Sequence, residues 1–302
     1  MNIQPMVSVI IPTFKRPQFL VRAITSVINQ TYKNIEIIVV DDNGEKTSYQ
    51  IETEKLLTPF IERNEITYIV HDKNRNGSAA RNTGIKSSKG EYITFLDDDD
   101  VLYNRKIEKQ VNFLENNNNY AGVYVGFEII LKQKKLKSVI PHKEGNLQFD
   151  LLSTNWGIGT GSNPMFRKEV FDTTGLFDES FIRHQDIEFL VRFFRTQKIG
   201  VISEILISRY IDSRENKVNC MKFIQVKEKF LSTFKNDIEH YNLRQQNIIL
   251  RAQYADIACH AMEEKKFKIA CYYYLKANKY KLLSPKIIAK ALAFGLFNYK
   301  VE

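Results

Sequence analysis

Four short apolar runs in the first hundred residues constrain the fold of this 302-residue chain more than any other feature. Each run is mostly apolar and contains a single polar residue, rather than the strict alternation of a half-exposed strand, as expected for a strand that is buried on both faces. Between the first two runs, Pro17 can open a helix, and Leu20, Ile24 and Val27 follow it at helical spacing. This alternation predicts parallel β-α-β units. The predicted strands are Val7–Ile11, Ile35–Val40, Ile66–Val70 and Tyr92–Leu96, and the later helices are Ser48–Arg63 and Ser78–Ser88.

The pattern changes after residue 100, where helices and antiparallel strands replace the regular alternation. From Asn216 onward only helical patterns remain, including two helices within Tyr254–Ser284 that join near Lys265. We therefore predict an α/β catalytic domain over residues 1–215 and a helical region over residues 216–302. The elements expected between them are a helix through Ile107, Val111 and Leu114, a hairpin of Gly122–Leu131 and Leu136–Ile140 around the basic turn Lys132–Lys135, a helix at Asp186–Thr196 and a strand at Ile199–Ile207.

Polar residues follow three of the predicted strands at their carboxyl ends, where open parallel sheets bind their ligands. The first strand ends at Pro12-Thr13, the second at Asp41-Asp42, and the fourth runs into Asp97–Asp100. Four successive carboxylates repel one another without a counter-charge, and a hard divalent cation such as Mg²⁺ or Mn²⁺ commonly supplies it. The structural alternative is a solvated acidic turn or helix N-cap. The position directly after a buried strand favours the metal site.

Composition narrows the class of protein. No apolar run reaches the roughly 18 residues that span a bilayer, and the N-terminal apolar run is typical of a core strand rather than a secretory signal. The cysteines are Cys220, Cys259 and Cys271; their odd number and wide spacing indicate a reducing compartment without structural disulfides or zinc. The formal net charge of +9 calls for an anionic partner or surface. Because no nucleic-acid module is present, we expect no nucleic-acid partner.

Four sequence blocks, in this order, closely resemble the family 2 glycosyltransferases of the GT-A fold. The resemblance covers about residues 6–210 and implies a Rossmann-like, mostly parallel sheet flanked by helices, here with a C-terminal helical extension. It also implies an inverting transfer from a nucleotide-sugar, usually a UDP-sugar, with Mn²⁺ or Mg²⁺. The blocks are VSVIIPTFKR, EIIVVDDN, NGSAARNTGI and GEYITFLDDDD.

The resemblance assigns donor-binding roles near the first two strands. Pro12 and Thr13 match the positions that line the nucleoside, and Asp42, with Asp41 beside it, matches the carboxylate that reads the uracil ring. A carboxylate accepts a hydrogen bond from a base N–H, which gives base selectivity. Arg81 matches a basic residue that faces the nucleotide. The alternatives are a turn cap on Asn43-Gly44 for the two aspartates and a solvated helix position for Arg81.

The acidic run matches the family's DxD motif, with Asp97 and Asp99 at its outer positions. Asp99 is the expected direct metal ligand, and Asp97 is the second candidate ligand. Asp97 or Asp98 is expected to contact the ribose or a metal-bound water. The chain has Asp98 where the family often has Ser, and Asn104 where it often has Pro.

The acceptor side of the resemblance rests on one carboxylate. Family members carry a general base at a helix start about ninety residues after the DxD motif, and Asp186 falls on that position. Inversion requires a base that takes the acceptor hydroxyl proton on the face opposite the leaving diphosphate. The family usually has Glu before this Asp, whereas this chain has Gln185. The structural alternative for Asp186 is a plain helix N-cap.

Two further residues are candidates for acceptor or diphosphate contacts. His184 lies two residues before Asp186, although a surface imidazole is an equal alternative. Trp156 is the only tryptophan and lies beside Gly157, which suits stacking of its ring on a sugar. A core position is the alternative for this ring.

The sequence therefore predicts a metal-dependent, inverting glycosyltransferase that moves sugar from a UDP-sugar to a saccharide or lipid-linked saccharide in bacterial surface polysaccharide synthesis. A nucleotidyltransferase is the first alternative, but it calls for a glycine-rich loop that PTFKRPQFL lacks. A non-catalytic nucleotide-sugar-binding protein is the second alternative. We expect a cytoplasmic location. Ser284–Lys300 could form a helix with apolar and basic sides that touches an anionic membrane, or could instead pack into a core.

Overall fold

The computed structural model describes residues 4–155, 157–211 and 218–280. The chain divides into two compact units, one of residues 1–147 and 157–214 and the other of residues 148–156 and 215–302. Within the described residues, every strand belongs to the first unit, and the second unit is helical. None of the described helices is long and apolar enough to cross a bilayer.

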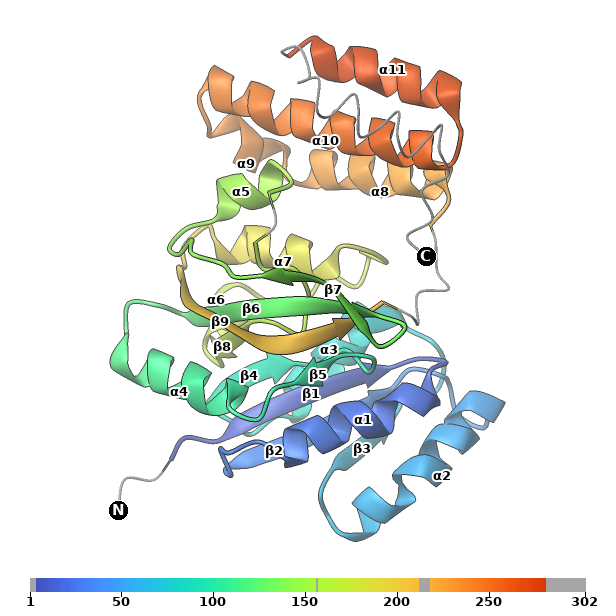
Figure 1. The fold of residues 1–302 in the computed structure, drawn as a ribbon, viewed down its shortest axis with the longest axis vertical. Helices are drawn as coiled ribbons and strands as arrows, with labels where there is room; N and C mark the ends of the chain where they lie inside the picture. The colour runs from blue at the N-terminus through green and yellow to red at the C-terminus, as the bar shows by residue number, and fades with distance from the viewer. Residues whose placement is uncertain (1–3, 156, 212–217, 281–302) are drawn as a thin grey trace. The chain divides into compact units, whose positions relative to one another are not determined.

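A nine-stranded sheet runs through the described part of the first unit, in the order β3-β2-β1-β4-β8-β6-β9-β5, with β7 paired to β6 (Figure 1). The neighbours β3, β2, β1 and β4 are parallel, which confirms the predicted β-α-β units. Strand β8 is antiparallel to both β4 and β6, so β6 runs in the same direction as β4. The strands are β1 Val7–Thr13, β2 Ile35–Asp41, β3 Thr67–Val70, β4 Tyr92–Phe95, β5 Val101–Leu102, β6 Gly122–Leu131, β7 Lys134–Val139, β8 Met165–Arg167 and β9 Ile199–Tyr210.

Helices pack on the sheet through the apolar stripes that the sequence contains. Helix α1 begins at Pro17, whose fixed φ suits the first helical position, and buries Leu20, Ile24 and Val27 in the main core. Helix α3 packs closely on β1 because residue 84 is glycine; a Cβ there would overlap the side chain of Ile10. The helices of this unit are α1 Pro17–Ile28, α2 Ser48–Glu62, α3 Asn76–Ser87, α4 Lys106–Asn116, α6 Val170–Thr173 and α7 Gln185–Phe193.

Several short elements were not predicted. Strands β5 and β8 have two and three residues, too few to show a period of two in the sequence. The hairpin strand β7 begins at Lys134 rather than at the predicted Leu136, because the turn contains only Lys132 and Gln133. Strand β9 continues past the predicted Ile207 to Tyr210, because its last residues pair with β6.

The second unit confirms a helix pair joined near Lys265. Helix α10, Leu243–Glu263, and helix α11, Phe267–Asn278, flank this residue, which has a φ of +60°. The predicted start at Tyr254 was wrong, since a capping box of Asn242 and Gln245 begins α10 earlier. The expected end of the pair, and the segment 284–300, lie outside the described residues. The other helices of this unit are α5 Gln148–Leu152, α8 Cys220–Thr233 and α9 Lys235–Glu239.

A lysine is enclosed in the first unit, at the start of α4. The side chain of Lys106 is fully buried, and its Nζ donates to Gln110 Oε1 at 2.8 Å. Thr94 Oγ1 lies 3.4 Å away. Burial lowers the pKa of Lys106 from 10.5 to about 7. Below that pH the folded protein carries a buried ammonium group without a carboxylate partner among the described ion pairs, which costs stability.

We predict that Lys106→Met stabilises the protein at pH 7 by about 1–3 kcal/mol. Between pH 7 and 10.5 the unfolded chain binds more protons at this residue than the folded protein does, so the wild type should gain stability as pH rises. In the variant, the free energy of unfolding should no longer rise with pH through this residue. Urea unfolding across this pH range measures both effects, with Lys55→Met on the exposed surface of α2 as control. If the variant and the wild type show the same dependence of stability on pH, the lowered pKa of Lys106 would be contradicted.

Candidate active site

The carboxyl ends of β1, β2 and β4 bring the predicted donor residues to one edge of the sheet. Thr13 ends β1 and donates its hydroxyl to Asp98 Oδ2 at 2.8 Å. Arg16 lies just before α1. Its Nη2 is 2.6 Å from Asp98 Oδ1, and its Nη1 is 2.7 Å from Asp99 Oδ2. The first strand and the acidic run therefore form one network of charges across 83 residues of sequence.

The four carboxylates of the acidic run have different surroundings. Asp98 and Asp100 are almost fully buried, and burial raises the pKa of Asp98 to about 7 and that of Asp100 to about 8. Asp100 Oδ2 accepts from Ser162 Oγ at 2.7 Å. Asp97 is more exposed and pairs with Arg81 at 2.7 Å. Arginines and hydroxyls thus contact the carboxylates of the run.

These residues fit a divalent cation that is shared with a substrate. In the described ranges, no group of three or more His, Cys, Asp or Glu side chains is arranged as a metal-binding cage. Asp97 and Asp99 offer carboxylate oxygens, and the arginines that now hold them show that this place accommodates positive charge. Mg²⁺ commonly binds in this way, through one or two carboxylates together with substrate phosphates and water.

Asp42 organises the segment that leads into α3. Its Oδ1 accepts from Arg75 N at 2.8 Å and lies 2.7 Å from His71 Nδ1. Its Oδ2 accepts from Asn76 N and from Asn74 Nδ2, both at 2.8 Å. A uracil N–H at Asp42 would have to share an oxygen that already accepts from this segment. The uracil-reading role stays a prediction, and the structure adds a folding role for this residue.

Asp41 and Pro12 belong to the strands β2 and β1 that end at this edge. Asp41 is fully buried and accepts from Asn43 N at 2.8 Å and from Tyr68 Oη at 2.6 Å. Burial raises the pKa of Asp41, and both hydrogen bonds oppose that increase. Pro12 is paired with Val40 within the sheet. Among the described contacts, Asp41 thus acts as a turn acceptor.

Arg81 connects the donor edge to the helix that carries the predicted base. From α3, its Nη2 donates to Asp97 Oδ1 at 2.7 Å, and its Nη1 donates to Gln185 Oε1 at 2.9 Å. Gln185 is the residue where the family usually has Glu. The amide oxygen of Gln185 accepts from one nitrogen of Arg81, so among the described residues a single carboxylate, that of Asp97, is hydrogen-bonded to this guanidinium.

Asp186 is the second residue of α7, and the N-cap position belongs to His184. Its Oδ1 accepts from Ile187 N at 3.0 Å. Burial raises the pKa of Asp186, and the charge of Arg81 partly opposes this effect. An N-cap role therefore does not account for this carboxylate. A raised pKa is suited to a group that takes up a proton during a reaction.

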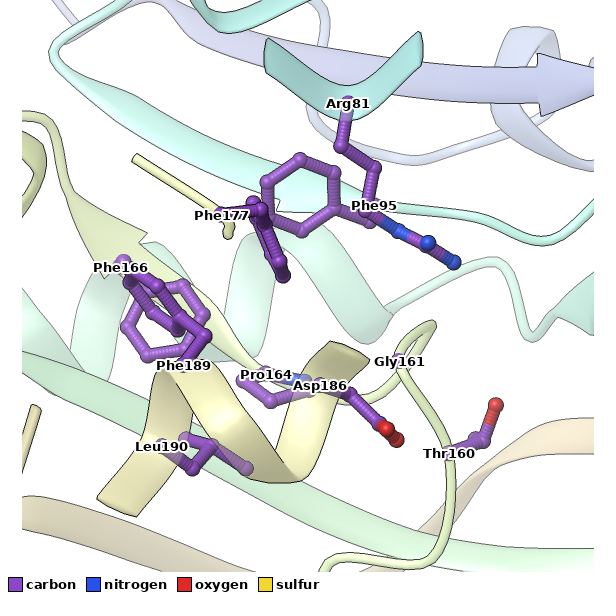
Figure 2. Close-up of a pocket in the computed structure, with 10 residues that line it drawn as sticks. All are labelled: Arg81, Phe95, Thr160, Gly161, Pro164, Phe166, Phe177, Asp186, Phe189 and Leu190. Atoms are coloured by element: carbon purple, nitrogen blue, oxygen red, sulfur yellow. The ribbon is translucent and has the colours of Figure 1, made fainter. Parts of the chain in front are cut away.

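Aromatic rings form one wall beside Asp186. Figure 2 shows Phe95, Phe166, Phe177 and Phe189 gathered on one side, while the polar ends of Arg81 and Asp186 point away from them. Thr160 and Gly161 complete the polar side of this pocket. The rings exclude water, which strengthens the electrostatic interactions of the two charged groups.

Arg209 is a site residue that the sequence analysis missed. It lies near the end of β9 and is half-buried, and its positive charge partly opposes the rise in pKa that burial causes at Asp100 and Asp186. Within the described residues its side chain makes no hydrogen bond or ion pair. The expected strand ended at Ile207, two residues too early, so Arg209 fell outside the predicted elements.

The two candidates for acceptor contacts differ in what the structure shows. His184 adopts a left-handed conformation with a φ of +58° directly before α7. This conformation is uncommon for a side chain with a Cβ and often marks a constrained site residue. Trp156 lies outside the described residues, and its sugar-stacking role stays a prediction.

Comparison with known proteins identifies the family. Residues 8–175 match the family model described as Glycosyl transferase family 2. An uncharacterized glycosyltransferase of Rickettsia prowazekii is 34% identical over 235 residues, which are 76% of this chain and 71% of that protein. A similar protein of Rickettsia felis is 34% identical over 218 residues, 70% of this chain but 35% of its own length.

Two staphylococcal proteins extend the comparison. Poly(ribitol-phosphate) beta-N-acetylglucosaminyltransferase TarP of Staphylococcus aureus is 30% identical over 196 residues, 64% of this chain and 58% of that protein. The crystal structure of S. aureus TarS 1-349 in complex with UDP-GlcNAc superposes with a TM-score of 0.66 at 13% identity, covering 97% and 89% of the two chains. The latter likeness confirms the expected GT-A fold. By its family model and its relatives, this chain belongs to the family 2 glycosyltransferases and is an enzyme that transfers a sugar.

Proposed function

We propose that the chain is an inverting, metal-dependent glycosyltransferase that moves a sugar from a UDP-sugar to a saccharide or lipid-linked saccharide in surface polysaccharide synthesis. The observation that carries this proposal is the position of Arg81, which joins Asp97 of the acidic run to the start of α7 and lowers the pKa of Asp186. Donor and acceptor chemistry thus converge at one edge of the sheet. TarS has been solved with UDP-GlcNAc, and TarP acts on poly(ribitol-phosphate), which supports a UDP-sugar donor and a polymer acceptor.

The donor half lies at the ends of β1, β2 and β4. The uridine would bind near Thr13 and Asp42, and the diphosphate would lie near Asp97 and Asp99. Arg81 would hold the diphosphate so that the anomeric carbon faces α7. A bound Mg²⁺ or Mn²⁺ would offset the negative charge that develops on the leaving diphosphate.

The acceptor half depends on Asp186. Its carboxylate takes the proton of the acceptor hydroxyl as the new bond forms between that oxygen and the anomeric carbon. The bond from the anomeric carbon to the diphosphate oxygen breaks on the opposite face, and UDP leaves with the electron pair. A single displacement of this kind inverts the anomeric configuration. Holding the two substrates in line supplies a large part of the rate enhancement.

Family membership removes the nucleotidyltransferase alternative and also opposes a non-catalytic role in sugar-nucleotide binding. A turnover assay tests the second alternative directly. We also propose a cytoplasmic location, which agrees with the absence of disulfides among the described cysteines, Cys220, Cys259 and Cys271. Contact of the segment 284–300 with an anionic membrane stays a prediction.

We predict that exhaustive chelation abolishes transfer and that Mn²⁺ or Mg²⁺ restores it. Asp99→Asn should weaken Mn²⁺ binding, because it removes a carboxylate charge from the site. UDP release measures the first effect, and electron paramagnetic resonance of free Mn²⁺ measures the second. Asp72→Asn, an exposed carboxylate, is the control for net charge. Undiminished turnover after chelation would contradict metal dependence.

We predict that UDP binds much more tightly than GDP and that Asp42→Asn narrows this difference. The same substitution should destabilise the protein by about 1.5–3 kcal/mol, because an amide cannot accept all the hydrogen bonds of the carboxylate. Calorimetry measures the affinities, and thermal unfolding measures the stability. Equal affinity for both nucleotides would reject uridine selection, and an unchanged stability would reject the folding role.

We predict that Asp186→Asn lowers kcat by about 10²–10⁴-fold and leaves UDP affinity intact. Arg81→Gln should move the acidic limb of the pH–rate profile to higher pH. The sign follows from the pKa of Asp186: burial raises it, Arg81 lowers it, and loss of Arg81 leaves the first effect unopposed. A limb that stays in place, or moves to lower pH, would show that Asp186 is not the titrating base.

A further inference from the structure

The hairpin of β6 and β7 carries a concentration of positive charge. Lys134, Lys135 and Lys137 are exposed along β7, and Lys132 lies in the turn. Since β6 runs in the same direction as β4, this turn leaves the sheet at the edge that also bears the acidic run. Lysines at this edge therefore lie toward the site rather than at the opposite end of the sheet.

A β-bulge divides these lysines between the two faces of the sheet. Lys134 lies opposite Leu131 and Lys135 opposite Ile130, but Lys137 lies opposite Ile129, so Leu136 is the extra residue. Directly opposed residues share a face, and successive residues alternate. Lys134 and Lys137 thus share one face, and Lys135 lies on the other. In agreement, Lys135 Nζ is 3.7 Å from Glu128 Oε2.

The face with Lys134 and Lys137 is also the face of Arg209. Ile129 is paired with Lys137 on one side and with Arg209 of β9 on the other. Strand spacing of about 4.8 Å places Lys137 roughly 10 Å from Arg209 along this line. We refer to Arg209, Lys137 and Lys134 as the basic row.

One contact and one electrostatic effect indicate that this face adjoins Asp186. Phe127 is two residues before Ile129 on β6 and so shares its face; its ring occupies the space that a Cβ on Gly159 would need. Gly159 directly precedes Thr160, which lines the pocket with Asp186. The positive charge of Arg209 also partly opposes the rise in the pKa of Asp186. The basic row therefore begins beside the predicted base and leads outward.

The turn has an unfavourable sequence for its backbone. Lys132 and Gln133 have φ values of +47° and +61°, where two-residue hairpins usually place Asn and Gly. A bulge beside it aims Lys137 at the catalytic face, as bulges near active sites often do for a side chain. The positive φ values and the bulge both cost conformational free energy, and both keep positive charge at this edge.

We propose that the basic row binds an anionic saccharide chain, so that the acceptor of this enzyme carries phosphate or carboxylate groups along its length. The inference rests on the proposed function for the position of Asp186, and it adds the chemical class of the acceptor. Arg209 would bind the charged group next to the reacting hydroxyl, and Lys137 and Lys134 would bind groups further along the chain. The simpler explanation is that these lysines only protect an edge strand from pairing with other chains.

The test uses the full chain with labelled phosphorylated dextran, neutral dextran of the same length, and vesicles that contain anionic lipid. One double variant, Lys134→Gln with Lys137→Gln, removes two charges from the basic row. Its matched control, Lys135→Gln with Lys55→Gln, removes two charges elsewhere. Thermal unfolding checks that each variant folds, and calorimetry with UDP checks the donor half separately.

The expected result is that the wild type binds phosphorylated dextran but not neutral dextran, and that the row variant binds it about tenfold more weakly. The control variant should bind within about twofold of the wild type, and added salt should weaken binding. Equal losses in both variants, equal binding of neutral dextran, or binding to vesicles alone would overturn the proposal. If the wild type does not bind UDP, the proposed function itself would be overturned.

Discussion

Charge compensation in the acidic run is the constraint on which the rest of the site depends. Four consecutive carboxylates follow a buried strand, and two of them, Asp98 and Asp100, are almost inaccessible to water. Each is held by residues from other parts of the sheet edge: Thr13 and Arg16 at the first strand, and Ser162 from the segment before β8. These contacts fix the relative positions of three strand ends before any substrate binds.

Arg81 extends this compensation to the acceptor side. It neutralises Asp97 and reaches Gln185, so the helix that bears Asp186 is held by the same charges that organise the donor edge. The departure from the family's usual Glu has a physical consequence, since Gln185 does not neutralise Arg81. More of the arginine's charge therefore remains available to Asp97, to Asp186 and to a bound diphosphate.

The regular part of the fold could be predicted because it depends on local patterns. Buried strands such as β1 and β2 are mostly apolar runs, and α1 begins at Pro17, where a proline is favourable. Strand β8 could not be predicted, because three residues show no periodicity and their antiparallel place between β4 and β6 is set by tertiary packing. The start of α10 was misplaced, although Asn242 and Gln245 form a recognisable capping box.

The residues of the site also fall into those that sequence motifs indicate and those that only tertiary structure brings in. Resemblance to the family located Asp97, Asp99 and Asp186, because these residues lie in or near sequence motifs. It could not show that Asp42 is engaged by the segment before α3, since those contacts depend on how that segment folds back. Arg209 lies in no motif, and its place near the end of β9, opposite Ile129, results from the pairing of β9 with β6. The one sequence signal for Arg209 was a basic residue near the end of a predicted strand.

The central claim is that Asp186 serves a single displacement at the anomeric carbon. The most direct test is the anomeric configuration of the product, measured by NMR for a reaction with an α-linked UDP-sugar. The account predicts a β linkage, as one in-line displacement requires. An α linkage would contradict it and would require either a covalent intermediate or attack from the same face as the leaving UDP.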